Sequence, residues 1–285
     1  MKKDRFLIVG LGLIGGSYAQ GLKRAGYEVG AISRAAETVR YALEQGFVDS
    51  ARTDVDADYV GGFDIVVFAL YPHVMLDWID RYQAFFKPGT LLTDVTGVKG
   101  TVVRQVQAKL RPGVEFVGAH PMAGRECSGI RAADYRIFSG ANYIVTPTAA
   151  NTPAAIARCE EIGRILGFKT ISTLSPEAHD EMIGFLSQLT HVIAVALMTC
   201  KDTTHLSAYT GDSFRDLTRI ARINDEMWSE LFLLNREQLL SQIDLFTNQM
   251  TAIRQALSDG DTEALRALMR LSTERRGGFD KTREP

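Results

Sequence analysis

The chain has 285 residues, 46% of them hydrophobic and 23% charged, with a formal net charge of −2 and a pI of about 6.2. This composition is that of a soluble globular protein with room for two domains, and its charge balance argues against nucleic acid as a partner. The cysteines Cys127, Cys159 and Cys200 show neither metal-ligand spacing nor a disulfide framework. We therefore expect no metal and a cytoplasmic location.

Neither the N-terminus nor the most apolar segment of the sequence indicates a membrane protein. The N-terminus runs directly into a short apolar segment and lacks the pattern of a signal peptide. The most apolar long stretch, residues 183–200, contains Ser187, Gln188, Thr190 and His191. These polar side chains favour a buried helix over a membrane span.

Short β-rich segments and amphipathic helical patterns alternate through the first 173 residues. We predict strands at residues 6–9, 27–33, 64–70, 91–95, 114–118, 143–146 and 169–173. Helices are predicted between most of them, including residues 39–45, 75–86, 101–109 and 153–166. Such alternation predicts an α/β fold with a doubly wound parallel sheet that helices cover on both faces.

The strand pattern ends near residue 175. The sequence Ser175-Pro176-Glu177 is typical of a helix start, with a capping serine and a proline at the first helical position. Long helical patterns follow at residues 176–200, 225–257 and 262–275. We therefore predict two domains, residues 1–173 and an all-helical C-terminal domain of residues 174–285.

Hydrophobic residues recur at helical spacing along the long helix predicted for residues 225–257. They include Phe232, Leu239, Ile243, Phe246, Met250, Ile253 and Leu257. Such a stripe either faces the core of its own chain or forms the seam of a dimer, and a helix this long needs much surface to cover it. Both interpretations stay open, and a homodimer through the helical domain is favoured.

A glycine-rich turn directly follows the first predicted strand. Gly10, Gly12 and Gly15 form the pattern Gly-x-Gly-x-x-Gly, with Leu13 and Ile14 inside it, and a helix and a second strand follow. This context predicts the βαβ unit of a Rossmann-type, dinucleotide-binding domain. The glycines would permit the tight turn, the approach of a pyrophosphate and the packing of helix on strand. A turn without a ligand is disfavoured, because three glycines at this spacing cost chain entropy without benefit.

The choice of cofactor depends on the end of the second predicted strand. An NAD site places an acidic residue there, to bind the ribose 2′-hydroxyl. Here Ser33 and Arg34 follow the strand, and the first acidic residue is Glu37. A hydroxyl and a guanidinium suit a 2′-phosphate, so we predict NADP, although an exposed turn arginine is the alternative. We also expect Leu70 and Tyr71, at the end of the third long strand, to contact the cofactor.

Two further segments follow predicted strands and should border the nicotinamide. Residues 94–99 contain Thr96, and residues 118–124 contain His120. The carboxyl ends of parallel strands face the ligand crevice, and histidine titrates near neutral pH, so His120 is a candidate acid or base. By position alone, a structural histidine is an equally good interpretation.

The helical half carries two more polar clusters. Ser187 and His191 lie four residues apart, on one face of a predicted helix. Arg219 lies in the segment Phe-Arg-Asp-x-Thr-Arg-Ile-Ala at residues 214–221, shortly before Trp228, and an arginine can bind a carboxylate through two hydrogen bonds. Taken alone, these are equally well read as core groups and a surface charge.

Together these segments resemble the prephenate/arogenate dehydrogenase family of tyrosine biosynthesis. The resemblance rests on the glycine turn, residues 94–100, Gly-Ala-His-Pro-Met-Ala-Gly at residues 118–124, Ser187-x-x-x-His191, and residues 214–221 with Met227-Trp228. It runs from about residue 5 to residue 280. The segments around His120 and Arg219 are its most specific parts, because neither is a general feature of dinucleotide-binding domains.

The resemblance implies an oxidative decarboxylation, in which a hydride passes from the ring carbon bearing the 4-hydroxyl to the nicotinamide. His120 would accept a hydrogen bond from that hydroxyl. The resemblance further assigns catalytic or pocket-lining roles to Ser187 and His191, and substrate-binding roles to Arg219, Thr96 and Trp228.

Two positions bear on the details of that resemblance. The family often has a serine where this chain has Gly97, so either the hydroxyl of Thr96 or a water replaces it. Glu126 follows the histidine segment, and if it lines the pocket it favours an ammonium group on the substrate, hence arogenate over prephenate.

Two other classes of protein share parts of these patterns. One is a different reductase with a Rossmann domain and a helical domain, acting on a hydroxy acid or an imine. Such enzymes usually rely on a lysine in the helical domain, where Lys201 is the only one before Lys281. The other is a non-catalytic dinucleotide sensor, which has no need for His120, Ser187, His191 and Arg219 together.

Overall fold

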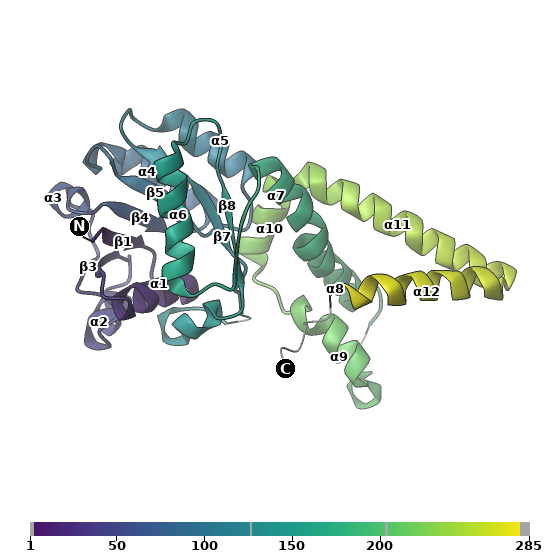
Figure 1. Ribbon diagram of the computed structural model, residues 1–285. Coiled ribbons are helices and arrows are strands. Elements are labelled where there is room, and N and C mark those ends of the chain that lie inside the picture. The colour runs from purple at the N-terminus through teal and green to yellow at the C-terminus, as the bar shows by residue number, and fades with distance from the viewer. Residues whose placement is uncertain (1–2, 126, 203–204, 280–285) are drawn as a thin grey trace, which may run out of the picture. The chain divides into compact units, whose positions relative to one another are not determined.

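The structure, a computed structural model, describes residues 3–125, 127–202 and 205–279 (Figure 1). The chain divides into two compact units, Met1–Arg236 and Glu237–Pro285. The first unit contains two β-sheets and the helices around them, and the second contains two long helices. The first unit thus extends well past residue 173, where the sequence analysis places a domain boundary.

A six-stranded parallel sheet forms the centre of the first unit, which confirms the predicted fold class. Its strands are β1 (Arg5–Val9), β2 (Glu28–Ile32), β3 (Ser50–Arg52), β4 (Ile65–Phe68), β5 (Leu91–Asp94) and β6 (Glu115–Phe116). They run in the order β3-β2-β1-β4-β5-β6, and each pair is parallel. The short edge strand β3 was not predicted, because its Ser-Ala-Arg sequence has no apolar run. The order reverses between β1 and β4, and ligands bind such sheets outside the carboxyl ends of the strands at that point.

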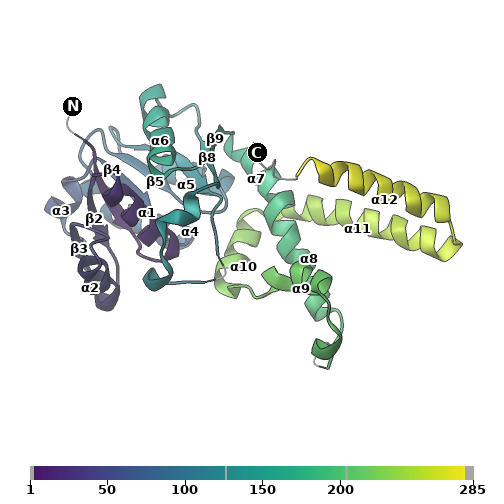
Figure 2. The same ribbon diagram turned by 60° about the horizontal axis from the view of Figure 1, so that its bottom comes forward.

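Helices cover both faces of this sheet (Figures 1 and 2). Along β1, Phe6 and Ile8 belong to one hydrophobic core while Leu7 and Val9 belong to another, because successive side chains of a strand point to opposite faces. Helices α1 and α6 contribute to the first core, and α4 and α5 to the second. The helices of this part are α1 (Leu13–Arg24), α2 (Ala36–Glu44), α3 (Ala57–Gly61), α4 (Pro72–Tyr82), α5 (Gly100–Lys109) and α6 (Pro153–Leu166).

The later strands form a second sheet, which corrects the prediction of a single one. It consists of β7 (Gly118–Pro121), β8 (Asn142–Thr146) and β9 (Thr170–Thr173), with β8 antiparallel to β7 and parallel to β9. The strand predicted at residues 114–118 is therefore wrong as one element, because the chain changes sheets after Val117. At Gly118 a Cβ would lie 2.5 Å from Thr146 Oγ1, so the crossing point requires glycine.

A long helical run follows the sheets. It comprises α7 (Pro176–Ile183), a π-helical turn (Gly184–Leu189) and α8 (Thr190–Thr199). Ser175 caps its start by accepting a hydrogen bond from the Ala178 N–H at 3.1 Å. The run is long and apolar enough to cross a membrane, with a hydropathy of 1.6, but core helices of soluble proteins share that property. Several of its side chains are buried within this chain, namely Ile183, Gln188, Leu189 and Ala194.

The helix predicted for residues 225–257 proves to be two helices, α10 (Asp225–Leu234) and α11 (Arg236–Asp259). They are separated at Asn235, whose φ of −113° and ψ of 27° are not helical. Its buried amide donates hydrogen bonds to Asp180 O at 2.9 Å and to Gln188 Oε1 at 2.8 Å. The hydrophobic spacing continues across Asn235, so periodicity could not reveal the break. Between α8 and α10 lie α9 (Asp212–Thr218) and the 3-10 turn η6 (Arg219–Ala221).

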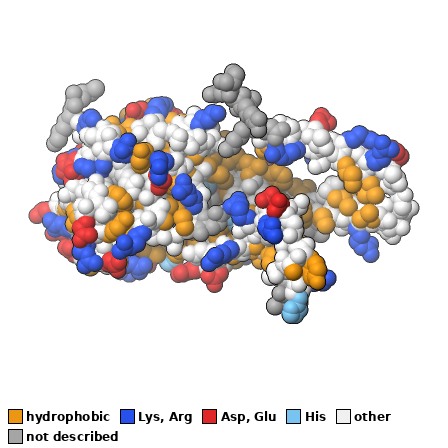
Figure 3. All heavy atoms as spheres, turned by 90° about the horizontal axis from the view of Figure 1, so that it is seen from below, with side chains coloured by type: hydrophobic (Ala, Val, Ile, Leu, Met, Phe, Trp, Pro, Cys, Tyr) orange, Lys and Arg blue, Asp and Glu red, His pale blue; other side chains and the backbone are white. Residues whose placement is uncertain are grey.

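The second unit consists of α11 and α12 (Thr262–Gly277). Gly260, with φ of +65°, forms the turn between them, and Asp261 caps α12 by accepting a hydrogen bond from the Ala264 N–H at 2.9 Å. Hydrophobic side chains are exposed along both helices (Figure 3). The large ones are Leu240, Leu245, Phe246, Met250 and Leu257 on α11, and Met269 and Leu271 on α12. Apolar surface on this scale indicates an interaction with another molecule.

Candidate functional site

The glycine turn lies where the strand order reverses, between the ends of β1 and β4. Gly10 has φ of +99°, and a Cβ there would lie 2.3 Å from Ala69 O. A Cβ on Gly15 would lie 1.9 Å from Gly10 O. By contrast, no atom lies within 4 Å of the Cβ position of Gly12. The turn is thus closely packed on the protein side and open at Gly12, which is the geometry that a pyrophosphate needs.

The N-terminus of α1 continues this open side. Its N-cap is Gly12, which has no side chain to cap the first N–H groups, and Leu13 and Ile14 are the first helical residues. Uncapped N–H groups and the positive end of the helix dipole favour a bound anion. The residues present therefore fit the diphosphate of a dinucleotide.

The other predicted cofactor residues lie at neighbouring strand ends. Leu70 follows β4 and packs against the glycine turn, and the Tyr71 hydroxyl accepts a hydrogen bond from Asn224 Nδ2 at 3.2 Å. Ser33 and Arg34 follow β2, and Arg34 is exposed. All of these residues therefore lie along the carboxyl edge of the parallel sheet.

A buried ion pair lies at the end of β5. Lys99 Nζ is 2.5 Å from Asp94 Oδ2, and both side chains are fully buried. Asp94 Oδ1 also accepts a hydrogen bond from the Ala119 N–H at 3.1 Å, which joins β5 to β7 immediately before His120. Burial lowers the pKa of Lys99, and the charge of Asp94 opposes that shift. The pair therefore fixes the strand that carries His120.

Thr96 belongs to this buried network. Its hydroxyl hydrogen-bonds to Asp94 and accepts a hydrogen bond from Lys99 Nζ at 3.1 Å, and the residue is 5% exposed. The hydroxyl is used inside the protein, so the structure does not support the prediction that Thr96 binds substrate.

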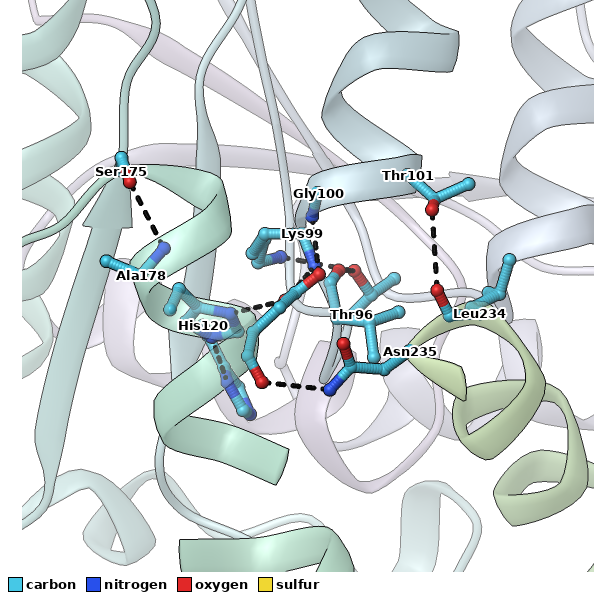
Figure 4. A network of polar contacts seen from close by, with 12 residues as sticks. Thr96, Lys99, Gly100, Thr101, His120, Ser175, Ala178, Leu234 and Asn235 are labelled. Carbon is cyan, nitrogen blue, oxygen red and sulfur yellow. Dashed lines mark hydrogen bonds and ion pairs between the residues drawn. The ribbon is translucent and has the colours of Figure 1, made fainter. Parts of the chain in front are cut away.

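His120 is the third residue of β7, and its side chain is partly exposed. Its Nδ1 lies 2.9 Å from Nε2 of His179 on α7 (Figure 4). His179 Nδ1 lies in turn 2.8 Å from Asp180 Oδ1. The Asp180 carboxylate accepts hydrogen bonds from the backbone N–H groups of Lys99 and Gly100, each at 2.7 Å. Three segments far apart in the sequence thus meet at His120.

The electrostatic surroundings keep both imidazoles neutral near neutral pH. Burial lowers the pKa of His120 well below its usual value, and His179 and Lys99 lower it further. Burial also lowers the pKa of His179, although Asp180 opposes that shift. A neutral imidazole can accept a hydrogen bond or a proton from a hydroxyl.

Helix α10 forms a second side of the site. A Cβ on Gly97 would lie 3.5 Å from Leu231 Cδ1 and 4.0 Å from His120 Cε1, so Gly97 faces the histidine. One turn earlier on α10, the Trp228 ring stacks on His191 with a centroid distance of 3.7 Å. Helix α10 thus runs from the surroundings of His120 to His191.

Ser187 and His191 lie together, as their spacing predicts. The contact is between His191 Nδ1 and the backbone carbonyl of Ser187, at 2.9 Å, rather than the serine hydroxyl. Because a carbonyl only accepts, Nδ1 of His191 carries the hydrogen. Arg219 is exposed and begins η6, which packs against α8. The predicted substrate residues of the helical half are thus held on adjoining elements.

Sequence analysis missed His179 and Asp180, the two residues that connect α7 to His120. The only signal in the sequence was a His-Asp pair shortly after a predicted helix start, and the structure shows that both residues are buried. Buried titratable residues need partners, but the sequence does not show which residues supply them. The partners lie 59 and 81 positions away, in β7 and at the start of α5.

Fold and site together define a nucleotide-binding α/β domain with a neutral histidine at a strand end, followed by a helical region. A family model described as the nucleotide-binding domain of prephenate dehydrogenase matches residues 18–171. A second, described as the prephenate dehydrogenase dimerization domain, matches residues 175–271. The chain belongs to the prephenate dehydrogenase family. Family membership sets aside the hydroxy-acid dehydrogenase and the non-catalytic sensor considered above.

Individual relatives agree along most of the chain. A prephenate dehydrogenase of Lactococcus lactis is 33% identical over 277 residues, which cover 93% of this chain and 74% of that protein. A cyclohexadienyl dehydrogenase of Zymomonas mobilis is 30% identical over 265 residues, 90% of each protein. A crystal structure of prephenate dehydrogenase from A. aeolicus, in complex with hydroxyphenyl propionate and NAD+, has a TM-score of 0.88 at 26% identity and covers 97% of this chain and 99% of that one.

Proposed function

We infer that the chain catalyses the oxidative decarboxylation of prephenate or arogenate in tyrosine biosynthesis, with His120 as the hydrogen-bond acceptor for the substrate 4-hydroxyl. The observation that carries the role of His120 is its partly exposed ring on β7, which contacts His179 at 2.9 Å in surroundings that lower the pKa of the ring. The buried Asp94–Lys99 pair fixes the backbone beside that ring, and Gly97 leaves the space next to it free of a side chain.

The reaction needs a hydrogen-bond acceptor more than it needs strong acid–base catalysis. A hydride leaves the ring carbon that bears the hydroxyl, and a bound nicotinamide supplies the acceptor for it. The bond to the ring carboxylate then breaks, its electron pair enters the ring, and carbon dioxide departs. As the hydride leaves, the hydroxyl becomes more acidic, and neutral His120 stabilises it by accepting its hydrogen bond. The aromatic product keeps its hydroxyl, so no net proton stays on His120.

We propose that the substrate side chain and carboxylates contact the helical side of the site. His191 and Ser187 line it, with His191 held against Trp228. Arg219 binds a carboxylate, because its guanidinium offers two parallel N–H donors. The support for this assignment is that η6, which begins with Arg219, packs against the helix that carries His191.

We propose that the cofactor is a nicotinamide dinucleotide bound by Gly10, Gly12, Leu13, Ile14 and Gly15, with Leu70 and Tyr71 beside the nicotinamide half. We further propose that NADP is preferred over NAD, because Ser33 and Arg34 stand where an NAD site has an acidic residue. The solved A. aeolicus relative contains NAD+, so this preference is a claim about the residues of this chain.

Steady-state kinetics with both cofactors test the preference. Changing Arg34 or Ser33 to Asp should shift the ratio of kcat/KM for NADP to that for NAD towards NAD, because a carboxylate repels a 2′-phosphate and binds a 2′-hydroxyl. Arg164→Asp, an equal charge change at an exposed position on α6, serves as the control. A wild-type enzyme that prefers NAD, or a ratio that the substitutions leave unchanged, contradicts the proposal.

The activity itself is tested by absorbance at 340 nm with prephenate and arogenate, each combined with NAD and NADP. Turnover of at least one substrate is expected, and none with either would refute the proposed function. The choice between the substrates also decides whether Glu126 favours an ammonium group, a residue that lies outside the described ranges.

We propose that two copies of the chain form a homodimer through residues 174–285. The support is the exposed apolar surface of α11 and α12 and the match of this region to a dimerization domain. Light scattering should give the mass of a dimer for the wild type and of a monomer for the double variant Leu245→Lys, Leu257→Lys. Leu43→Lys, at an exposed leucine of α2, is the matched control. A wild-type monomer contradicts this proposal.

Two further proposals concern the domain boundary and the cellular location. We propose a boundary at residues 173/174 between the nucleotide-binding and helical domains, supported by the gap between the two family matches at residues 171 and 175. We also propose a cytoplasmic location, supported by Cys127, Cys159 and Cys200, which are all free thiols.

A further inference from the structure

The carboxylate of Asp180 accepts hydrogen bonds from the start of helix α5. It lies on α7, yet both of its oxygens accept hydrogen bonds from the first N–H groups of α5, at Lys99 and Gly100. The N-cap residue, Lys99, makes no capping hydrogen bond with its own side chain. Backbone N–H groups only donate, so both Asp180 oxygens act as acceptors in these contacts. Asp180 is 5% exposed, so water competes little with these contacts.

The direction of each hydrogen bond from Asp180 to His120 follows from these contacts. Both Asp180 oxygens accept from backbone N–H groups, so His179 Nδ1 donates its hydrogen to Asp180 Oδ1. A neutral His179 has one hydrogen, so its Nε2 carries a lone pair. His120 Nδ1 lies 2.9 Å from that Nε2 and must therefore be the donor. In a neutral His120, Nε2 then has the free lone pair.

We propose that His179 and Asp180 are positioning residues that hold His120 in the Nδ1–H tautomer, so that its Nε2 accepts the substrate hydroxyl. The assignment rests on the proposed function, because it matters only if His120 must be an acceptor. With the opposite tautomer, an N–H group would meet the hydroxyl, and the developing positive charge on that oxygen would lose its acceptor.

The other neighbours of His120 do not orient its ring. A Cβ at Gly97 would come within 4.0 Å of His120 Cε1, but glycine offers no hydroxyl that could orient the ring. The ammonium of Lys99 is paired with Asp94, and its charge disfavours a second positive charge on His120. Orientation of the ring is therefore assigned to the contact with His179.

Nitrogen-15 NMR of the full chain tests the tautomer directly, without substrate. The protein has five histidines, so single His→Gln variants can assign each ring. In the wild type at neutral pH we expect His120 and His179 to be protonated on Nδ1, with bare Nε2 atoms. In Asp180→Asn, whose amide can donate to His179, we expect His120 to shift towards the Nε2–H form. A wild-type His120 protonated on Nε2, or an unchanged tautomer in Asp180→Asn, overturns the proposal.

A pair of substitutions at His179 separates positioning from a purely structural role. In His179→Gln the amide oxygen can replace Nε2 as an acceptor for His120 Nδ1–H, whereas His179→Leu offers no acceptor. We expect the Leu variant to lower kcat by about 100-fold, within the usual range for such catalysis, with little change in KM. The Gln variant should recover a large part of kcat. Equal kcat losses in both variants, or losses that only follow the melting temperature, contradict the proposal.

Asp56→Asn provides the matched control, because Asp56 caps α3 by accepting a hydrogen bond from the Tyr59 N–H at 2.9 Å. The same carboxylate-to-amide change there should leave kcat and the His120 tautomer unaltered. If Asp180→Asn does not fold, the wild-type tautomer and the His179 pair still decide the question. The tautomer is measured without turnover, so its outcome is independent of whether prephenate or arogenate is oxidised.

Discussion

The glycine turn at residues 10–15 and the histidine chain from His120 to Asp180 are both functional parts of one unit, but they are assembled differently. The turn is formed by consecutive residues, and its tight contacts are within the turn itself and with Ala69 and Leu70, which follow β4. The histidine chain joins β7, α7 and the start of α5, across 59 and 81 positions of sequence. The first depends on backbone shape and the second on side-chain charge. Substitutions in the glycine turn should therefore affect cofactor binding or local folding. Substitutions in the histidine chain should affect the rate of the chemical step.

The largest effect is expected for His120→Ala, which removes the acceptor for the substrate hydroxyl. We expect kcat to fall by about 10²–10⁴-fold while the dissociation constant for the cofactor stays unchanged. Stopped-time assays at 340 nm and fluorescence titration of the cofactor measure the two quantities. His205→Ala, at an exposed histidine, is the control. Parallel losses of turnover and cofactor affinity would show that the two regions are not separate.

A pair of glycine substitutions separates the packing of the turn from its role in cofactor binding. In Gly15→Ala the new methyl group would lie 1.9 Å from Gly10 O, so we expect a loss of stability of about 1–3 kcal/mol or more. In Gly12→Ala the methyl group meets open space, so the melting temperature should be unchanged. Cofactor binding should nevertheless weaken by about tenfold, or about 1.4 kcal/mol, because the methyl group occupies the approach of the pyrophosphate. Equal stability losses would contradict this interpretation of Gly12.

A smaller effect is expected for Asn235→Ala, which tests how α10 is fixed to the histidine chain. The substitution leaves Asp180 O and Gln188 Oε1 without the buried donor that both now share. A buried polar group that loses its partner costs about 1–3 kcal/mol, which chemical denaturation can measure. Asn248→Ala, at an exposed position of α11, should cost almost nothing. A neutral Asn235→Ala would mean that water satisfies both oxygens.

Sequence patterns were most informative where the physics is local. The glycine turn, the helix start at Ser175 and the parallel core strands follow from neighbouring residues, and each is present. Patterns failed where a distant contact decides the local structure. Asn235 interrupts a continuous hydrophobic stripe because its amide binds Asp180 and Gln188. Val114–Gly118 was read as one strand because nothing local marks the change of sheets.

The residues of the candidate site also differ in whether local sequence or distant contacts define them. His120 was chosen as a candidate because it follows the strand predicted at residues 114–118, although the structure places it within β7. Ser187 and His191 were chosen from their helical spacing. Substrate binding by Thr96 stays a prediction, and the contacts of its hydroxyl with Asp94 and Lys99 could not be foreseen from the sequence. His179 and Asp180 could not be chosen in advance, since their roles depend on partners that only the fold brings close.

The smallest effect expected is in the pH dependence, and it sharpens the comparison between the regions. Burial lowers the pKa of both His120 and His179, so the pair should stay neutral as pH falls past the ordinary histidine value of about 6.5. We expect kcat/KM to stay nearly constant there and to fall only at lower pH, with an apparent pKa that belongs to the coupled pair. Below about pH 6.5 the unfolded chain binds protons that the folded chain does not, so the free energy of unfolding should decrease as pH falls.

The turn contains no titratable group, so the dissociation constant for the cofactor should not follow the same curve. In His179→Gln the neighbouring imidazole no longer lowers the pKa of His120, and the acid limb of kcat/KM should move to higher pH. Activity profiles and denaturation curves across this range measure both effects. If kcat/KM of the wild type already falls at or above pH 6.5, His120 is better solvated than its contacts imply. Burial would then not explain why its imidazole is neutral.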